Sequence, residues 1–180
     1  MSVPFPNFWV RKIRSFFVLF DRDLDGIVHR EDYVDKVIER AKKYLSEEKV
    51  KHFETLIAKA WDEFWGGPEG KTALTIDELI TSVSPRVFSD SHFAETCKEW
   101  LTVYFQGVDA NDDGYVTLSE YTAFLECFNV HPFSVTPSFE VLDTNHDGLI
   151  SLEEFINTGT EYFCVTADTP AKLFWGPFLA

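Results

Sequence analysis

Residues 143–154 read Asp-Thr-Asn-His-Asp-Gly-Leu-Ile-Ser-Leu-Glu-Glu, with carboxylate or carboxamide side chains at the first, third and fifth positions and a glutamate at the twelfth. A hard cation such as calcium takes about six to eight oxygen ligands, and this spacing supplies them from those four side chains and from the backbone carbonyl at the seventh position. Glycine at the sixth position allows the sharp turn, because it adopts positive φ without a Cβ penalty. The predicted ligands are Asp143, Asn145, Asp147, the carbonyl of Leu149, and Glu154.

The same spacing recurs in residues 109–120, where every ligand position is kept. A single match of this kind is weak support in an acidic chain, because carboxylates are common in it. Two complete matches, each between stretches of helical periodicity, indicate a repeated ion-binding unit. The predicted ligands of this second match are Asp109, Asn111, Asp113, the carbonyl of Tyr115, and Glu120.

Residues 21–32 form a further copy that ends in aspartate rather than glutamate. Aspartate is one methylene shorter, so it reaches an ion less easily with both oxygens, and fewer oxygens favour the six-coordinate geometry of magnesium. We therefore expect magnesium to compete with calcium most strongly at this loop, the alternative being a loop that has lost ion binding. Its predicted ligands are Asp21, Asp23, Asp25, the carbonyl of Ile27, and Asp32.

Amphipathic stretches with apolar residues at helical spacing flank the three loops, so the repeating unit is a helix, an acidic loop and a second helix. The apolar residue at the eighth loop position lets two loops join through a short β-ribbon, which predicts a fourth unit. Residues 67–78 are the best candidate, since they keep the apolar eighth residue and the final glutamate. The first, third and fifth positions of this loop are Gly67, Glu69 and Lys71. We expect it to pair with the first loop without binding an ion.

The predicted fold is all-α, with two pairs of units packed into one compact body. The N-terminal pair is assigned to residues 1–88 and the C-terminal pair to residues 89–180. The second pair ends in an apolar tail, residues 170–180, which includes Leu-Phe-Trp-Gly-Pro at 173–177. The tail is either a segment that docks on a partner or a plug that fills the groove between the pairs. An aromatic content of 16% favours the plug, because the chain must bury many rings.

The net charge of −14, from 30 acidic and 16 basic residues, excludes a nucleic-acid partner and favours cations. Ten of the acidic residues are predicted ion ligands. No apolar run is long enough for a signal peptide or a membrane anchor, and three widely spaced cysteines do not form a disulfide framework. No catalytic motif is present. We therefore expect a cytoplasmic, monomeric protein that is not an enzyme.

Particular segments resemble the invertebrate sarcoplasmic calcium-binding proteins. They are Trp-Val-Arg-Lys at 9–12, Leu-Asp-Thr-Asn-His-Asp-Gly-Leu-Ile-Ser-Leu-Glu-Glu-Phe at 142–155, and the 173–177 segment. The resemblance implies four EF-hands in two pairs, with the second silent and three binding calcium. It also implies a cytosolic buffer, often in muscle, in which magnesium occupies some of the sites.

Composition also favours a buffer over a sensor, because a sensor opens a flexible, methionine-rich groove and this chain has one methionine. We therefore expect a high-affinity calcium and magnesium buffer with three functional loops, located in the sarcoplasm if it is expressed in muscle. Two relatives of the same family leave alternatives open. One is a calexcitin-like signalling protein, and the other is a coelenterazine-type luciferin binder with an apolar ligand between the pairs.

Overall fold

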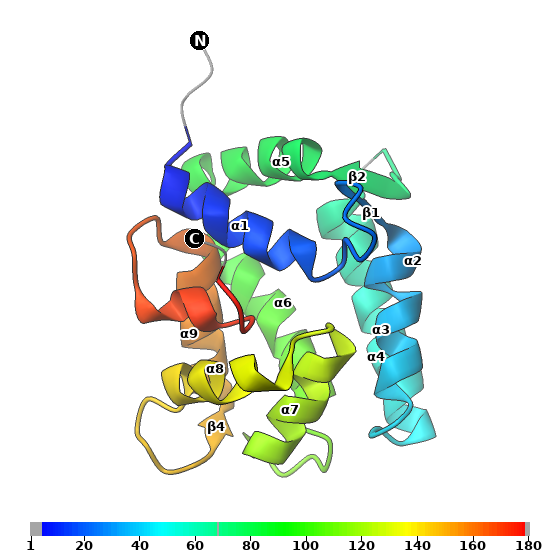
Figure 1. Ribbon diagram of the computed structural model, residues 1–180, viewed down its shortest axis with the longest axis vertical. Helices are drawn as coiled ribbons and strands as arrows, with labels where there is room; N and C mark the ends of the chain where they lie inside the picture. Colours follow the sequence, from blue (N-terminus) through cyan, green and yellow to red (C-terminus); the bar gives the residue numbers. More distant parts are fainter. Residues whose placement is uncertain (1–4, 68, 179–180) are drawn as a thin grey trace.

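The computed structural model describes residues 5–67 and 69–178 (Figure 1). The predictions that concern residues 1–4 of the first pair, residue 68 of the second loop and residues 179–180 of the tail lie outside the described residues. The helices are α1 (Asn7–Val18), α2 (Arg30–Tyr33), α3 (Asp35–Ala41), α4 (Glu47–Ala60), α5 (Ile76–Ser89), α6 (Phe93–Val108), α7 (Leu118–Cys127), α8 (Val135–Leu142) and α9 (Leu152–Cys164). The strands are β1 (Ile27–His29), β2 (Ala73–Thr75), β3 (Tyr115–Val116) and β4 (Ile150–Ser151).

Helices α7 and α9 begin at capping boxes that lie inside the acidic loops. In α9, the Ser151 side chain accepts the backbone N–H of Glu154, whose carboxylate accepts the backbone N–H of Ser151 in return. Thr117 and Glu120 do the same in α7. The reciprocal bonds satisfy two backbone donors that a helix start leaves free. The last residue of each loop is thereby held in a defined orientation by the helix that it begins.

Two short antiparallel ribbons join the loops in pairs. Strand β1 pairs with β2, with Val28 opposite Leu74, and β3 pairs with β4, with Val116 opposite Ile150. All four of these apolar residues are buried. The ribbons are those expected from the eighth loop position, and the all-α fold of paired helix–loop–helix units is confirmed.

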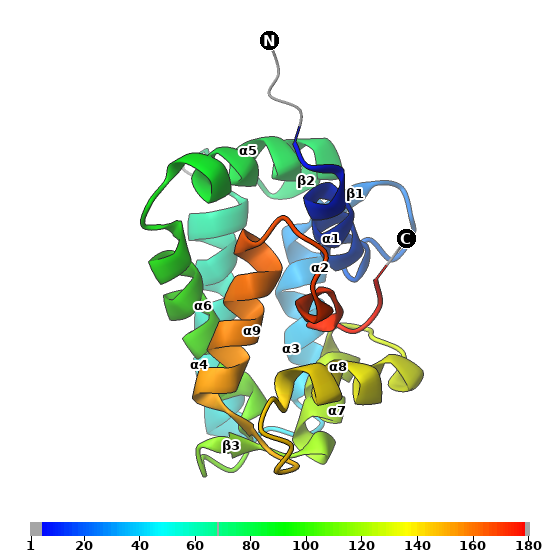
Figure 2. The ribbon, with the colours of Figure 1, turned by 90° about the vertical axis from the view of Figure 1, so that its left-hand side faces the viewer.

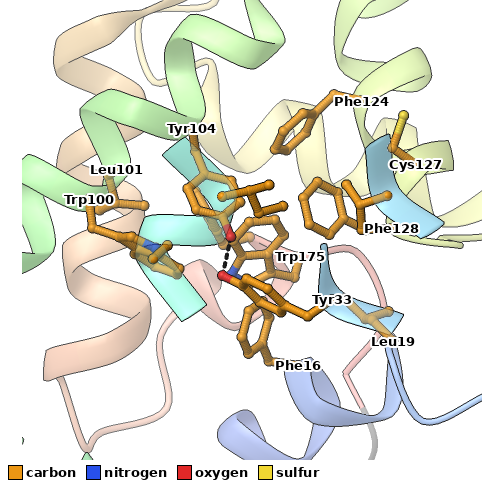
Figure 3. Packing of buried hydrophobic residues seen from close by; sticks show 14 of the residues in the cluster. Phe16, Leu19, Tyr33, Trp100, Leu101, Tyr104, Phe124, Cys127, Phe128 and Trp175 are labelled. Carbon is orange, nitrogen blue, oxygen red and sulfur yellow. Dashed lines mark hydrogen bonds between the residues drawn. The ribbon is translucent and has the colours of Figure 1, made fainter. Parts of the chain in front are cut away.

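The two pairs pack against each other through an aromatic core (Figure 3). The phenol groups of Tyr33, from α2, and Tyr104, from α6, hydrogen-bond each other at its centre. The indole of Trp9 in α1 donates to the carbonyl of Phe163 in α9 at 2.9 Å. Helix α9 itself lies alongside α6 (Figure 2). The Tyr33–Tyr104 and Trp9–Phe163 hydrogen bonds join the two pairs into a single packed unit.

Phe174 and Trp175 of the apolar tail are buried in the core, as the plug interpretation predicts. Trp175 is 1% exposed, and its ring centroid lies 5.0 Å from that of Phe16 and 5.2 Å from that of Phe128. Phe16 belongs to the N-terminal pair and Phe128 follows α7 in the C-terminal pair. The indole of Trp175 therefore occupies space that both pairs enclose (Figure 3).

Candidate metal centres

The fourth loop, residues 143–154, orients its acidic side chains with backbone N–H groups. The two carboxylate oxygens of Asp143 accept the backbone N–H groups of Asp147 at 3.1 Å and Gly148 at 2.9 Å. Asp147 accepts the N–H of Leu149 at 2.9 Å, which fixes the turn that presents the Leu149 carbonyl. His146 and Gly148 both have positive φ, and glycine adopts this conformation without strain. Hydrogen bonds within the loop thus orient the side chains of Asp143 and Asp147.

The third loop, residues 109–120, repeats this arrangement. Asp109 accepts N–H groups from Asp113 at 3.2 Å and from Gly114 at 2.9 Å, and Asp113 accepts that of Tyr115 at 2.9 Å. In both loops the asparagine at the third position accepts the N–H of the fifth residue, at 3.0 Å for Asn111 and at 2.9 Å in the fourth loop. Loops that share a sequence pattern therefore share a hydrogen-bond pattern.

Glu154 combines burial with a charged carboxylate. Its side chain lies among residues of the fourth loop, and the residue is 8% exposed. Burial alone would raise the pKa of this carboxyl group, but hydrogen bonds donated by Ser151, Thr144 and Asn145 outweigh it and hold the pKa below its ordinary value. The carboxylate therefore stays ionised at neutral pH and offers two oxygens to a cation.

The first loop, residues 21–32, also gathers oxygen atoms suited to a cation. One carboxylate oxygen from each of Asp21, Asp23 and Asp25 lies within 4.8 Å of the other two. The Oδ2 atom of Asp21 accepts the N–H of Gly26 at 3.0 Å, but its Oδ1 atom is buried without a hydrogen-bond partner among the described residues. A buried oxygen without a partner is costly unless a donor or a cation meets it. The donor set fits a hard divalent ion.

Asp32, the last residue of the first loop, has both carboxylate oxygens engaged by protein groups. Its Oδ2 atom accepts the N–H of His29, the ninth residue of the loop, at 3.2 Å. The last residue of each other loop accepts the N–H of its own ninth residue in the same way. Its Oδ1 atom accepts from the Lys36 ammonium at 2.5 Å. Lys36 lies one helical turn beyond Asp32, so the pair is local. An ion that takes both oxygens of Asp32 has to compete with this ammonium group.

The second loop has a lysine side chain among its ligand positions. The ammonium of Lys71, at the fifth position, lies 3.1 Å from a carboxylate oxygen of Glu78 at the twelfth position. The backbone N–H of Thr75 and the Lys71 ammonium hold the pKa of Glu78 below its ordinary value. A lysine thus bridges ligand positions that an ion would bridge in the other loops. This arrangement supports the prediction of a loop that pairs without binding.

Two contacts connect the loops to the opposite pair. The Lys49 ammonium, from α4, lies 2.8 Å from the Asp112 carboxylate and also donates to the backbone carbonyl of Asp109. The guanidinium of Arg22 donates to the Asn129 side chain, which follows α7, at 2.6 Å. Asp112 and Arg22 are not predicted ligands, and Lys49 contacts Asp109 through its backbone carbonyl. Neither contact therefore uses the side-chain oxygen of a predicted ligand. The first and third loops are therefore each held by a group from the other half of the molecule.

Comparison with known proteins places this site in a family. Residues 98–158 match the family described as EF-hand domain pair. The chain is 32% identical to the sarcoplasmic calcium-binding protein of Perinereis vancaurica tetradentata over 176 residues, which cover 96% of this chain and 99% of the relative. The chain belongs to the sarcoplasmic calcium-binding protein family. It is a calcium-binding EF-hand protein, as the sequence resemblance implies.

Solved structures of more distant sequence share the fold of this chain. The amphioxus sarcoplasmic calcium-binding protein matches with a TM-score of 0.69 at 18% identity, covering 96% of this chain and 98% of that one. The coelenterazine-binding protein of Renilla muelleri matches with a TM-score of 0.74 at 23% identity, covering 93% and 94%. At these identities the likeness concerns the fold alone.

The acidic loops could be predicted from the sequence, but the lysines that contact them were not. The pairing of Lys36 with Asp32 had a readable signal, since an acid and a base four residues apart meet on a helix face. The pairing of Lys71 with Glu78 was predicted in part, because the sequence places a positive charge at a ligand position. The contact of Lys49 with the third loop had no local signal, because it joins segments that touch in space but lie 60 residues apart in sequence.

Proposed function

We propose that the chain buffers calcium through three loops, whose ligands are the residues predicted above for residues 21–32, 109–120 and 143–154. The observation that carries the proposal is the preset orientation of the first, third and fifth side chains by backbone N–H groups. The Oδ1 atom of Asp21, buried without a hydrogen-bond partner in the described part of the chain, extends the proposal to the first loop. The ordering cost of the ligands is met largely by folding, which favours tight binding.

The first loop is the one at which magnesium competes most strongly. The Lys36 ammonium leaves Asp32 best able to offer one oxygen, and a site with one oxygen fewer suits six-coordinate magnesium. In a cell with millimolar magnesium, calcium would then bind there only as magnesium leaves. The buffer would respond more slowly than a sensor.

The filled core favours a buffer over the two alternatives. The Trp175 indole occupies the space between the pairs. A void of about 10 Å³ lies within the N-terminal pair, where it is lined by residues such as Phe16, Tyr33 and Trp65. That is room for about one water molecule. A luciferin between the pairs would have to displace the tail, and so would a target helix that docks as calmodulin targets do.

We further propose that the protein acts as a monomer without catalytic activity in the cytoplasm, or in the sarcoplasm of muscle. Among the described residues, no helix combines the length and the apolar character that crossing a membrane requires. We also propose that the two pairs, assigned to residues 1–88 and 89–180, act as one body.

A calorimetric titration of ion-stripped protein with calcium, without and with millimolar magnesium, tests the proposal. Three sites, of which the first is strongly suppressed by magnesium, are expected. Two sites of micromolar affinity that magnesium leaves unchanged would contradict the assignment of the first loop and reopen the sensor interpretation. Glu78→Gln serves as a matched control, because this glutamate occupies the twelfth position of the loop that already holds Lys71.

A further inference from the structure

Helices α6 and α9 run antiparallel in a register that brings two cysteines together. The Phe105 and Phe155 rings lie 5.7 Å apart between their centroids. One turn along, the helices approach so closely at Gly159 that a Cβ there would lie 2.6 Å from a methyl carbon of Leu101. One further turn places Cys97, on α6, beside the end of α9.

Cys164 is the last residue of α9, and the register of the two helices places it next to Cys97, whose thiol it influences electrostatically. Cys97 is buried, whereas Cys164 is partly exposed. A disulfide needs Cα atoms about 4.4–6.8 Å apart, which most helix pairs exceed at their axes. The glycine contact one turn away supplies the close approach of the two backbones.

The ammonium group of Lys12, on α1, lies close to Cys164. Lys12 is fully buried, donates to the carbonyl of Val165 at 2.5 Å, and lies 5.5 Å from the centre of the Tyr162 ring. Burial lowers the pKa of Lys12 to about 8, against the opposing influence of Cys164 and of acidic neighbours. The neighbouring Cys97 thiol and the Lys12 charge hold the pKa of Cys164 below its ordinary value, and the proximity of Cys164 together with burial raises the pKa of Cys97.

We propose that Cys97 and Cys164 form a peroxide-sensitive dithiol that closes to a disulfide between α6 and α9. The Cys164 thiolate attacks one oxygen of hydrogen peroxide, the O–O bond breaks, and the products are the Cys164 sulfenic acid and hydroxide. The Cys97 thiolate, formed as its proton passes to the leaving oxygen, then attacks the Cys164 sulfur. The S–S bond forms as the S–O bond breaks, and water leaves. Overall, two thiols and one peroxide give one disulfide and two waters.

The crosslink would join the helix that enters the third loop to the helix that leaves the fourth. Both ion-binding loops of the C-terminal pair therefore lie between its two anchor points. A bond in a reducing compartment is transient, so cellular thiols would reopen it. Redox state would thus act on the C-terminal pair without touching an ion ligand.

The test treats the full chain, loaded with calcium, with hydrogen peroxide and then titrates thiols in denaturant. We expect two of the three cysteines to disappear, with a loss of two hydrogens by intact mass and a peptide that joins residues 97 and 164. Cys127→Ser is the matched control, because that thiol is also buried but donates to the Ala123 carbonyl at 3.2 Å, away from the pair. It should still lose two thiols.

Cys97→Ser separates a dithiol from an isolated reactive thiol. The variant should give no disulfide, and its Cys164 sulfenic acid should be trapped by dimedone. Lys12→Met should slow the oxidation at neutral pH while leaving the disulfide as the product. Three intact thiols in the wild-type chain, a disulfide that involves Cys127, or Cys164 sulfinic acid without a crosslink would each overturn the proposal.

Discussion

Removing the indole of Trp175 tests whether the tail is part of the core. Trp175→Ala would leave a cavity of roughly 140 Å³, and at about 24 cal/mol per Å³ the cavity alone costs about 3 kcal/mol. The lost transfer free energy adds to this cost, whereas partial collapse of the surrounding rings subtracts from it. The indole N–H has no hydrogen-bond partner among the described residues, so no hydrogen bond is lost. We expect a total loss of about 4 kcal/mol in the free energy of unfolding.

Denaturant unfolding of the calcium-loaded variant, followed by circular dichroism, measures this loss. Trp175→Phe is the matched control, since it keeps a ring among Phe16, Phe124 and Phe128 and removes the unpartnered N–H; its cost should stay under about 2 kcal/mol. An apolar cavity of this size binds small aromatic molecules, so benzene should stabilise the alanine variant and not the wild type. A loss below about 1 kcal/mol in Trp175→Ala would refute the plug interpretation.

Three further changes address the loops. Glu154→Gln should remove one site from the calcium stoichiometry, whereas Glu78→Gln should leave it unchanged; an unchanged count in the first variant would refute the assignment. In ion-free protein the depressed pKa of Glu154 gives a stability contribution that is complete above the unfolded pKa and is lost as pH falls through the folded one, so wild type and Glu154→Gln should converge in acid unfolding curves. Asp32→Glu should weaken magnesium competition at the first loop, and a competition titration without that change would count against the single-oxygen argument. Lys49→Met removes a positive charge beside the third loop and should tighten calcium binding there by about 3- to 10-fold at low salt. Equal calcium affinities of the variant and the wild type at every salt concentration would contradict this prediction.

The acidic loops were predictable because their chemistry is local. Ligand spacing, the sixth-position glycine and the capping glutamate all lie within twelve consecutive residues, so Asp143 and Glu154 could be assigned without knowledge of the fold. The ribbons followed from the same spacing. The position of Lys49 could not be predicted, because it depends on how α4 packs against the C-terminal pair.

The contact of Cys97 with Cys164 depends in the same way on the register of two helices that are distant in sequence. The tail lies between these cases. Its apolar composition indicated burial, but the rings that surround Trp175 come from segments spread over the whole chain. Composition could predict the burial of Phe174 and Trp175 but not the residues that contact them.

The position of Trp175 in the chain has a consequence for biosynthesis. Every helix from α1 to α9 leaves the ribosome before the residue that fills the space between them. Chains fold from the N-terminus during synthesis at roughly 5–20 residues per second, so the loops and their ribbons can form while the centre of the core is still missing. A nascent chain that ends before the tail would expose the rings of Phe16, Tyr104 and Phe128. Completion of the core is therefore a late event, and a chain truncated before residue 174 would be a natural substrate for chaperones and proteases.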